Sequence, residues 1–230
     1  MQEFTIFGIH VKDYTQKESL HLLGEYLNNG GLNTVSYLNT QMLVDSEKDE
    51  QCQEWLNSLD MTNAAEPEII KAGGQADSNR LKEVGTGHIL KNLIQKITRQ
   101  KLTTYLITDS NASMIELERE LRQLQPSMKV GGRFVLDDEM QSSSREDAMV
   151  NDINDVAPTV IISRLPYKEQ IRLMADNKKR INGELWLGLL CNVSLHGTQM
   201  QRGGFLNSFF YRKLFSRKVS KYNSDRNEQI

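Results

Sequence analysis

Short apolar runs rich in β-branched residues alternate with amphipathic segments along most of the chain. The short runs predict buried strands, and the segments with apolar residues three or four positions apart predict helices. The expected strands are residues 4–11, 34–38, 102–108, 128–135, 159–163 and 184–190. The expected helices begin near 15, 40, 110, 143 and 167. This alternation predicts an α/β fold, a Rossmann-like parallel sheet with helices on both faces.

Two helix starts carry recognisable capping residues. Thr15 followed by Glu18 is typical of a capping box, in which each side chain satisfies a backbone N–H of the other residue. Ser110 or Asn111 is expected to cap the helix that Pro126 later stops.

The segment 35–43 predicts a buried strand that ends in a polar pair, Asn39 and Thr40, and turns at once into a helix. In open parallel sheets ligands bind at the carboxyl ends of the strands, so this pair is a candidate for a binding site. The same residue types are ordinary at helix N-termini, where they only cap the backbone. Both interpretations stay open from this segment alone.

Composition excludes several classes of protein. A chain of 230 residues can bury one substantial core plus a small appendage. Its formal net charge of −2 indicates no nucleic-acid partner. No apolar run approaches the length of a membrane span, and the first residues do not resemble a secretory signal, so we expect a cytoplasmic protein.

The sequence predicts neither a metal site nor a cofactor. Cys52 and Cys191 are far apart and outside any ligand spacing, so both are expected to be reduced, half-buried thiols. The segment Gly85-Thr86-Gly87 imitates the start of a dinucleotide fingerprint. Leu90 stands in the third glycine's place and no strand precedes the segment, so the signal is weak.

The C-terminal part has a different composition. Residues 202–221 contain six basic residues, no acidic residue and several aromatic ones. Such a mixture suits a helix that lies on an anionic membrane surface. The alternative is a helix that packs its aromatic side chains on the core while its lysines face water. We therefore expect an α/β domain over 1–195 and an appendage over 196–230 that associates peripherally with the inner face of the plasma membrane.

Six segments, read in order, carry a resemblance to a known family. They are Phe7–Val11, Tyr37–Asn39, Tyr105–Ile107, Lys129–Gly131, Pro166–Glu169 and Phe209–Arg212. Their order and spacing resemble the bacterial WecG/TagA/CpsF family, glycosyltransferase family 26, over about residues 4 to 218. The resemblance implies a nucleotide-sugar transferase that acts in the synthesis of teichoic acid, enterobacterial common antigen, exopolysaccharide or capsule.

The resemblance also implies where substrates bind, and the departures from the family fall on these positions. The family's proposed general base, an aspartate, corresponds to Ala65, and a family arginine corresponds to Glu83. Glu66 or Glu68 could replace the missing base from one turn away. Both also flank Pro67 at a helix start, where acidic residues are favoured without any catalytic role. The substrate-binding positions that the resemblance implies are Asn39, Glu83, Lys168, Glu169 and Arg212.

Three functions are consistent with this pattern. The first is transfer of a sugar from a UDP-sugar donor to a lipid-linked saccharide acceptor at the cytoplasmic face. The second is a catalytically inactive paralogue that binds or scaffolds another, active glycosyltransferase. The third is a simple nucleotide-sugar binding module. Because Ala65 has no proton-accepting group, we expect weak or no activity towards UDP-N-acetylmannosamine.

Overall fold

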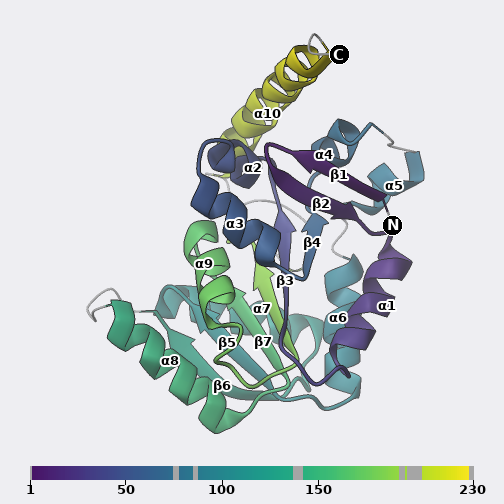
Figure 1. The fold of residues 1–230 in the computed structure, drawn as a ribbon. Helices are drawn as coiled ribbons and strands as arrows, with labels where there is room; N and C mark the ends of the chain where they lie inside the picture. Colours follow the sequence, from purple (N-terminus) through teal and green to yellow (C-terminus); the bar gives the residue numbers. More distant parts are fainter. Residues whose placement is uncertain are drawn as a thin grey trace.

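The computed structural model describes residues 2–74, 78–84, 88–136, 142–191, 195 and 204–227. Within these ranges the strands of the main sheet are β3 (Asn33–Leu38), β4 (Met61–Ala64), β5 (Thr104–Thr108), β6 (Val130–Val135), β7 (Val160–Arg164) and β8 (Leu185–Leu189). The strands are parallel and lie in the order β4–β3–β8–β7–β5–β6 (Figure 1). The prediction of a parallel α/β sheet is confirmed.

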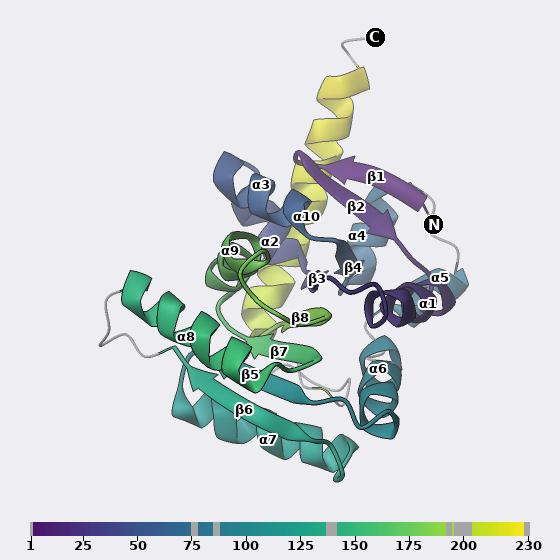
Figure 2. The same ribbon diagram turned by 60° about the horizontal axis from the view of Figure 1, so that its bottom comes forward.

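Helices cover both faces of this sheet (Figure 2). One face, here the α6 face, carries α1 (Gln16–Tyr26), α6 (His88–Arg99) and α7 (Asn111–Leu124). The other, here the α9 face, carries α2 (Thr40–Ser46), α3 (Glu50–Ser58), α8 (Ser142–Val156) and α9 (Tyr167–Asn177). The remaining helices are α4 (Pro67–Ala72), α5 (Ser78–Glu83) and α10 (Gly204–Asn227).

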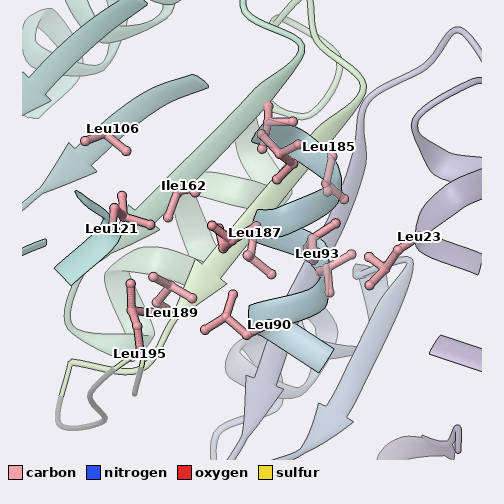
Figure 3. Close-up of a cluster of buried hydrophobic side chains, with 14 of the residues drawn as sticks. Leu23, Leu90, Leu93, Leu106, Leu121, Ile162, Leu185, Leu187, Leu189 and Leu195 are labelled. Atoms are coloured by element: carbon pink, nitrogen blue, oxygen red, sulfur yellow. The ribbon is translucent and has the colours of Figure 1, made fainter. Parts of the chain in front are cut away.

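The core on the α6 face follows from the two periodicities of the sequence. Leu90, Leu93 and Ile97 lie on one side of α6 because they are three or four residues apart. They pack on side chains from alternate strand positions, such as Leu185 and Leu187 of β8 (Figure 3). Figure 3 also shows Leu23 of α1 reaching α6 from the other side, so α6 is enclosed between the sheet and α1.

The first predicted strand, residues 4–11, is wrong in its extent. The chain forms an antiparallel hairpin, β1 (Gln2–Ile6) and β2 (Ile9–Asp13), outside the main sheet. Phe7 and Gly8 make its two-residue turn with φ angles of 50° and 79°. Two successive positive φ values are typical of the tight turns that suit the twist of a hairpin, and Gly8 adopts one of them without strain.

Other boundaries differ as well. The pattern predicted no element between residues 60 and 101, where the structure has β4, α4, α5 and α6. β4 has only four residues, two of which are polar, so its alternation is too short to recognise. The capping box at Thr15 is confirmed, because Glu18 N donates to the threonine side chain and Thr15 N donates to the glutamate.

Helix α10 is docked by part of its surface and projects from the molecule at its C-terminal end (Figure 1). Phe215 is only 1% exposed and packs edge-to-face on Phe7 of the hairpin turn, with 6.1 Å between the ring centroids. Phe209 and Phe210 remain exposed. No helix in the described ranges is long and apolar enough to cross a membrane.

Candidate functional site

Asn39 lies at the carboxyl end of β3, where the sequence left two interpretations open. Its side-chain oxygen accepts a hydrogen bond from Met42 N at 2.8 Å, so it caps α2. Thr40, the first residue of that helix, donates its backbone N–H to Glu66 Oε2 at 2.7 Å. The carboxyl ends of β3 and β4 are therefore joined by a glutamate at a helix N-terminus, an electrostatically favourable position for a carboxylate.

Glu66 also contacts helix α10. Its other oxygen, Oε1, accepts a hydrogen bond from Arg212 Nε at 3.2 Å. The same Arg212 nitrogen lies 3.8 Å from Glu68 Oε2. We call Glu66, Glu68 and Arg212 the carboxylate cluster. Arg212 is 146 residues away from Glu66 in sequence, and α10 brings it to the carboxyl edge of the sheet.

The two glutamates of the carboxylate cluster differ in how free they are to accept a proton. Glu66 is 6% exposed, and each carboxylate oxygen has a partner. A substrate proton would have to displace one of these partners. Glu68 Oε2 has the longer contact with Arg212 and no hydrogen bond in the described part of the chain. Glu68, in the first turn of α4, is therefore the glutamate whose carboxylate is less engaged by neighbouring donors.

Lys168 and Glu169 lie at the start of α9, on the same face of the sheet as α2, but they do not contact the carboxylate cluster. Lys168 Nζ lies 2.7 Å from Asp49 Oδ2, and this hydrogen bond lowers the pKa of Asp49 and raises that of Lys168. Glu169 Oε1 accepts a hydrogen bond from Arg145 Nη2 at 3.0 Å. Both side chains link α9 to neighbouring helices.

Glu83, the last residue of α5, has its contacts away from the carboxylate cluster, beside the N-terminus of α1. Gln16 N donates to Glu83 Oε2 at 3.2 Å, and Arg80 Nη1 lies 3.5 Å from the same oxygen. Arg80 in turn binds Asp13 Oδ1 through Nη2 at 2.5 Å. Glu83 therefore satisfies a helix N-terminus, a function that the arginine of the family could not perform.

The sequence reasoning missed a second set of contacts that hold α10. The Tyr167 hydroxyl donates to Asp45 Oδ2 at 3.1 Å, and Tyr211 is hydrogen-bonded to the same carboxylate. Burial raises the pKa of both phenols, with the charge of Asp45 as the second cause. Tyr211 precedes Arg212 in sequence, so adjacent residues of α10 bind Asp45 and Glu66. The only sequence signal was the family-like segment at 209–212.

The cysteines are free, as expected, but their burial differs from the expectation. Cys52 is fully buried, and Cys191 is exposed. Partial desolvation of its sulfur, with a further contribution from Asp109, raises the pKa of Cys191 to about 11, while Arg164 opposes the shift.

Among the described residues, no group of three or more histidine, cysteine or acidic side chains could hold a metal ion. Gly85 to Gly87 lie outside the described residues.

The chain is an α/β protein with a Rossmann-like parallel sheet, and the carboxylate cluster lies at its carboxyl edge, where proteins of this class bind ligands. A model of the glycosyl transferase WecG/TagA/CpsF family matches residues 4–194. The chain belongs to this family, whose members are glycosyltransferases of cell-surface polysaccharide synthesis. No curated protein matches the chain.

Proposed function

We propose that the protein transfers a sugar from a UDP-sugar to a lipid-linked saccharide during synthesis of a bacterial surface polysaccharide, with Glu68 as the general base. The observation that supports this most strongly is the carboxylate cluster at the carboxyl ends of β3 and β4. Glu66 and Glu68 are one and three residues from Ala65, where the resemblance places the base, and α10 adds the guanidinium of Arg212 to them. Asn39 positions α2, and Arg212 faces the negative charge that develops on the leaving nucleotide.

The direct test is UDP release by the purified protein with a lipid-linked saccharide acceptor and a panel of donors: UDP-N-acetylmannosamine, UDP-N-acetylglucosamine and UDP-glucose. We expect one donor to support turnover and UDP-N-acetylmannosamine to support little. Glu68→Gln keeps the shape of the side chain and should lower kcat at least about tenfold, as loss of a general base does. Glu66→Gln is the matched control for Glu68→Gln. It makes the same chemical change at a glutamate whose two oxygens already accept hydrogen bonds. A Glu68→Gln enzyme with wild-type kcat contradicts the assignment of the base.

A catalytically inactive paralogue is the second candidate, and Ala65 is the observation that favours it. In that case the protein binds an active glycosyltransferase and has no turnover of its own with any donor. Adding it to an intact family member should raise that enzyme's stability or turnover. Measurable turnover by the protein alone, abolished by Glu68→Gln, would rule this candidate out.

We further propose that 196–230 is an appendage that holds the α/β domain, residues 1–195, at an anionic membrane surface. Two basic residues of α10 are engaged inwards: Arg212 with the carboxylate cluster and Lys218 with Glu47. Lys213, Arg217 and Lys221 are exposed and four residues apart, so they form one stripe along the helix. Exposed Phe209 continues this stripe by one turn, and Lys213 Nζ lies 5.4 Å from the centroid of its ring. Basic and aromatic side chains on one face supply the two signals that stable attachment needs.

Charge reversal tests the appendage better than truncation, because removal of α10 would expose the cluster around Phe215. The variant Lys213→Glu/Arg217→Glu/Lys221→Glu should lose at least about 3 kcal/mol of binding to phosphatidylglycerol vesicles, about 1 kcal/mol for each cation, which is more than a hundredfold. Lys91→Glu/Arg99→Glu/Arg119→Glu makes the same change of charge at exposed positions of α6 and α7. Equal co-sedimentation of the two triple variants would show that the exposed stripe does not bind the membrane and only keeps the outer face of α10 in water.

A further inference from the structure

The last side chains of the strands on the α6 face form a row that crosses the whole sheet. Asn63 pairs in register with Tyr37, Arg164 pairs with Leu189 and with Thr108, and Thr108 pairs with Val135. Ser36 pairs with Gly188, so the residues that follow them, Tyr37 and Leu189, are also neighbours. We call this row the terminal row: Asn63, Tyr37, Leu189, Arg164, Thr108 and Val135.

The terminal row is polar where the row below it is apolar. Two residues earlier on the same face lie Met61, Val35, Leu187, Ile162 and Leu106, all buried in the hydrophobic cluster of the α6 face. Only the member of this row on the edge strand β6, Arg133, is polar. An uninterrupted continuation of that cluster would need apolar residues in the next row as well. Four of the six residues in the terminal row are polar instead, and they lie at the edge of the sheet where ligands bind in α/β proteins.

Two of these buried polar residues keep a donor without a partner. Asn63 is 3% exposed: its Oδ1 accepts from Ser19 Oγ at 3.3 Å, and its Nδ2 has no hydrogen bond. Arg164 is 5% exposed: its Nη2 donates to Glu120 Oε2 at 2.8 Å, and its Nε has no hydrogen bond. Buried donors without partners are rare because they lose their bonds to water and gain nothing in return.

Tyr37 adds a third donor between them. Its hydroxyl has no hydrogen bond to any residue that the structure describes, and burial raises its pKa, so it remains protonated. All three free groups are N–H or O–H donors. A ligand that satisfies them must therefore present acceptor oxygens.

The spacing of the donors sets the length of this ligand. Asn63 and Arg164 are separated by β3 and β8, which is three strand spacings or about 14 Å. A single sugar or phosphate cannot reach both ends of such a row. An elongated molecule with acceptor oxygens along its length can.

We propose that the terminal row is the floor of the donor site and that it sets the direction in which a nucleoside diphosphate sugar lies: the sugar at Asn63 and Tyr37, the nucleoside at Arg164. The proposal rests on the proposed function, because the carboxylate cluster lies at the ends of β3 and β4 and the reacting sugar must lie near it.

The side chains at the nucleoside end of the terminal row have chemistry that suits a nucleoside. Glu120 neutralises Arg164, which favours a neutral carbonyl or hydroxyl oxygen over a phosphate, and Asp109 at the end of β5 can accept from a ribose hydroxyl.

The experiment measures the affinity of the 230-residue chain for uridine, UDP and UDP-N-acetylglucosamine by calorimetry. Tyr37→Phe removes only a hydroxyl that has no partner in the described residues, so the variant should fold normally. Its affinity for UDP-N-acetylglucosamine should fall about three- to tenfold, the effect of one hydrogen bond, while its affinity for uridine and UDP stays unchanged. Asn63→Ala should show the same selectivity.

Arg164→Lys keeps a cation beside Glu120 but has no Nε–H group, so it should weaken uridine, UDP and the UDP-sugar alike. Two matched controls lie elsewhere. Tyr26→Phe removes a hydroxyl that donates to Asp60 O at the other end of the sheet, and Arg172→Lys alters an ion pair with Glu146 on the α9 face. Neither control should change any affinity.

The outcomes separate this inference from the proposed function. Wild-type affinities in all three terminal-row variants would overturn the inference and leave a UDP-sugar enzyme intact. The inference would also be overturned if Tyr37→Phe weakened uridine binding while Arg164→Lys left it unchanged, because the nucleoside would then lie at the opposite end of the row. A wild-type protein that binds none of the three probes would overturn the inference and the proposed function together.

Discussion

Glu83 stands where the resemblance places an arginine, and its contacts explain the change in sign. Its carboxylate accepts the backbone N–H of Gln16 at the start of α1 and lies beside Arg80. A helix N-terminus favours a negative side chain and disfavours a positive one. The departure from the family is therefore part of how α1 is held.

An arginine at position 83 should therefore destabilise the protein. Glu83→Arg removes the acceptor of Gln16 N and adds a second cation beside Arg80, so we expect the free energy of unfolding to fall by about 1–2 kcal/mol. Urea denaturation measures this. Glu25→Arg puts the same change near the other end of α1, where a cation is favourable, and should cost nothing. A Glu83→Arg protein of unchanged stability with higher transferase activity would contradict this account.

At the scale of secondary-structure elements, β6 depends on a glycine for its contact with β5. A Cβ atom on Gly132 would lie 2.4 Å from a ring carbon of Tyr105, which is fully buried and hydrogen-bonded to Asp152. The ring therefore has no room to move. β6 can reach its register with β5 only because this position has no side chain.

Gly132→Ala should destabilise the protein by about 1–3 kcal/mol, the usual cost of forcing extra atoms into a packed interior. Gly31→Ala is the matched control, because a Cβ there would have no atom within 4 Å. Its effect should stay within about 0.5 kcal/mol. Thermal and urea denaturation of both variants measure the difference, and equal losses would contradict the account of β6.

Helix α10 is divided between buried and exposed aromatic side chains. Phe215→Ala should weaken the docking of α10 by about 3 kcal/mol or more, because the ring is 1% exposed and contacts the hairpin turn. Limited proteolysis with mass spectrometry should then detect faster cleavage within residues 204–227. Phe209→Ala, at a ring that is 56% exposed, should leave the cleavage rate unchanged. Equal protection of both variants would show that Phe215 does not anchor the helix.

At the scale of the whole molecule, the sheet, α2, α4 and α10 meet at one edge, so ligand binding there should stabilise the entire fold. A UDP-sugar at one hundred times its dissociation constant contributes about 2.7 kcal/mol. For a chain of this size that corresponds to a rise in melting temperature of about 5–10 °C. Differential scanning fluorimetry with and without UDP-N-acetylglucosamine tests this. A flat response to every UDP-sugar would favour the scaffold over the enzyme.

Much of the fold could be predicted because its signals are local. The β-branched run that contains Tyr105 and the amphipathic segment that begins at Tyr167 reveal their periods within about ten residues. The capping box at Thr15 and the cap at Ser110 involve only neighbouring residues. The strand β4 was missed because four residues are too short to show a period.

The site could be predicted only in part. Asn39, Glu66, Glu68 and Arg212 were named from the sequence, and three-dimensional contacts join them through Thr40 N and Arg212 Nε. Glu83, Lys168 and Glu169 were named with them, and each has a partner elsewhere. Residue type and position along the chain do not reveal which partner a charged side chain finds.

The sequence by itself determined the class of fold and the order of most elements, because hydrophobic periodicity and helix caps act over a few residues. Only the tertiary structure decided that Arg212 meets Glu66 and that Glu83 meets Gln16, pairs that lie 146 and 67 residues apart. It also decided the terminal row, since polar residues from separate strands become neighbours only when the register of every strand is set. Register depends on packing across the whole sheet, and no local pattern contains it.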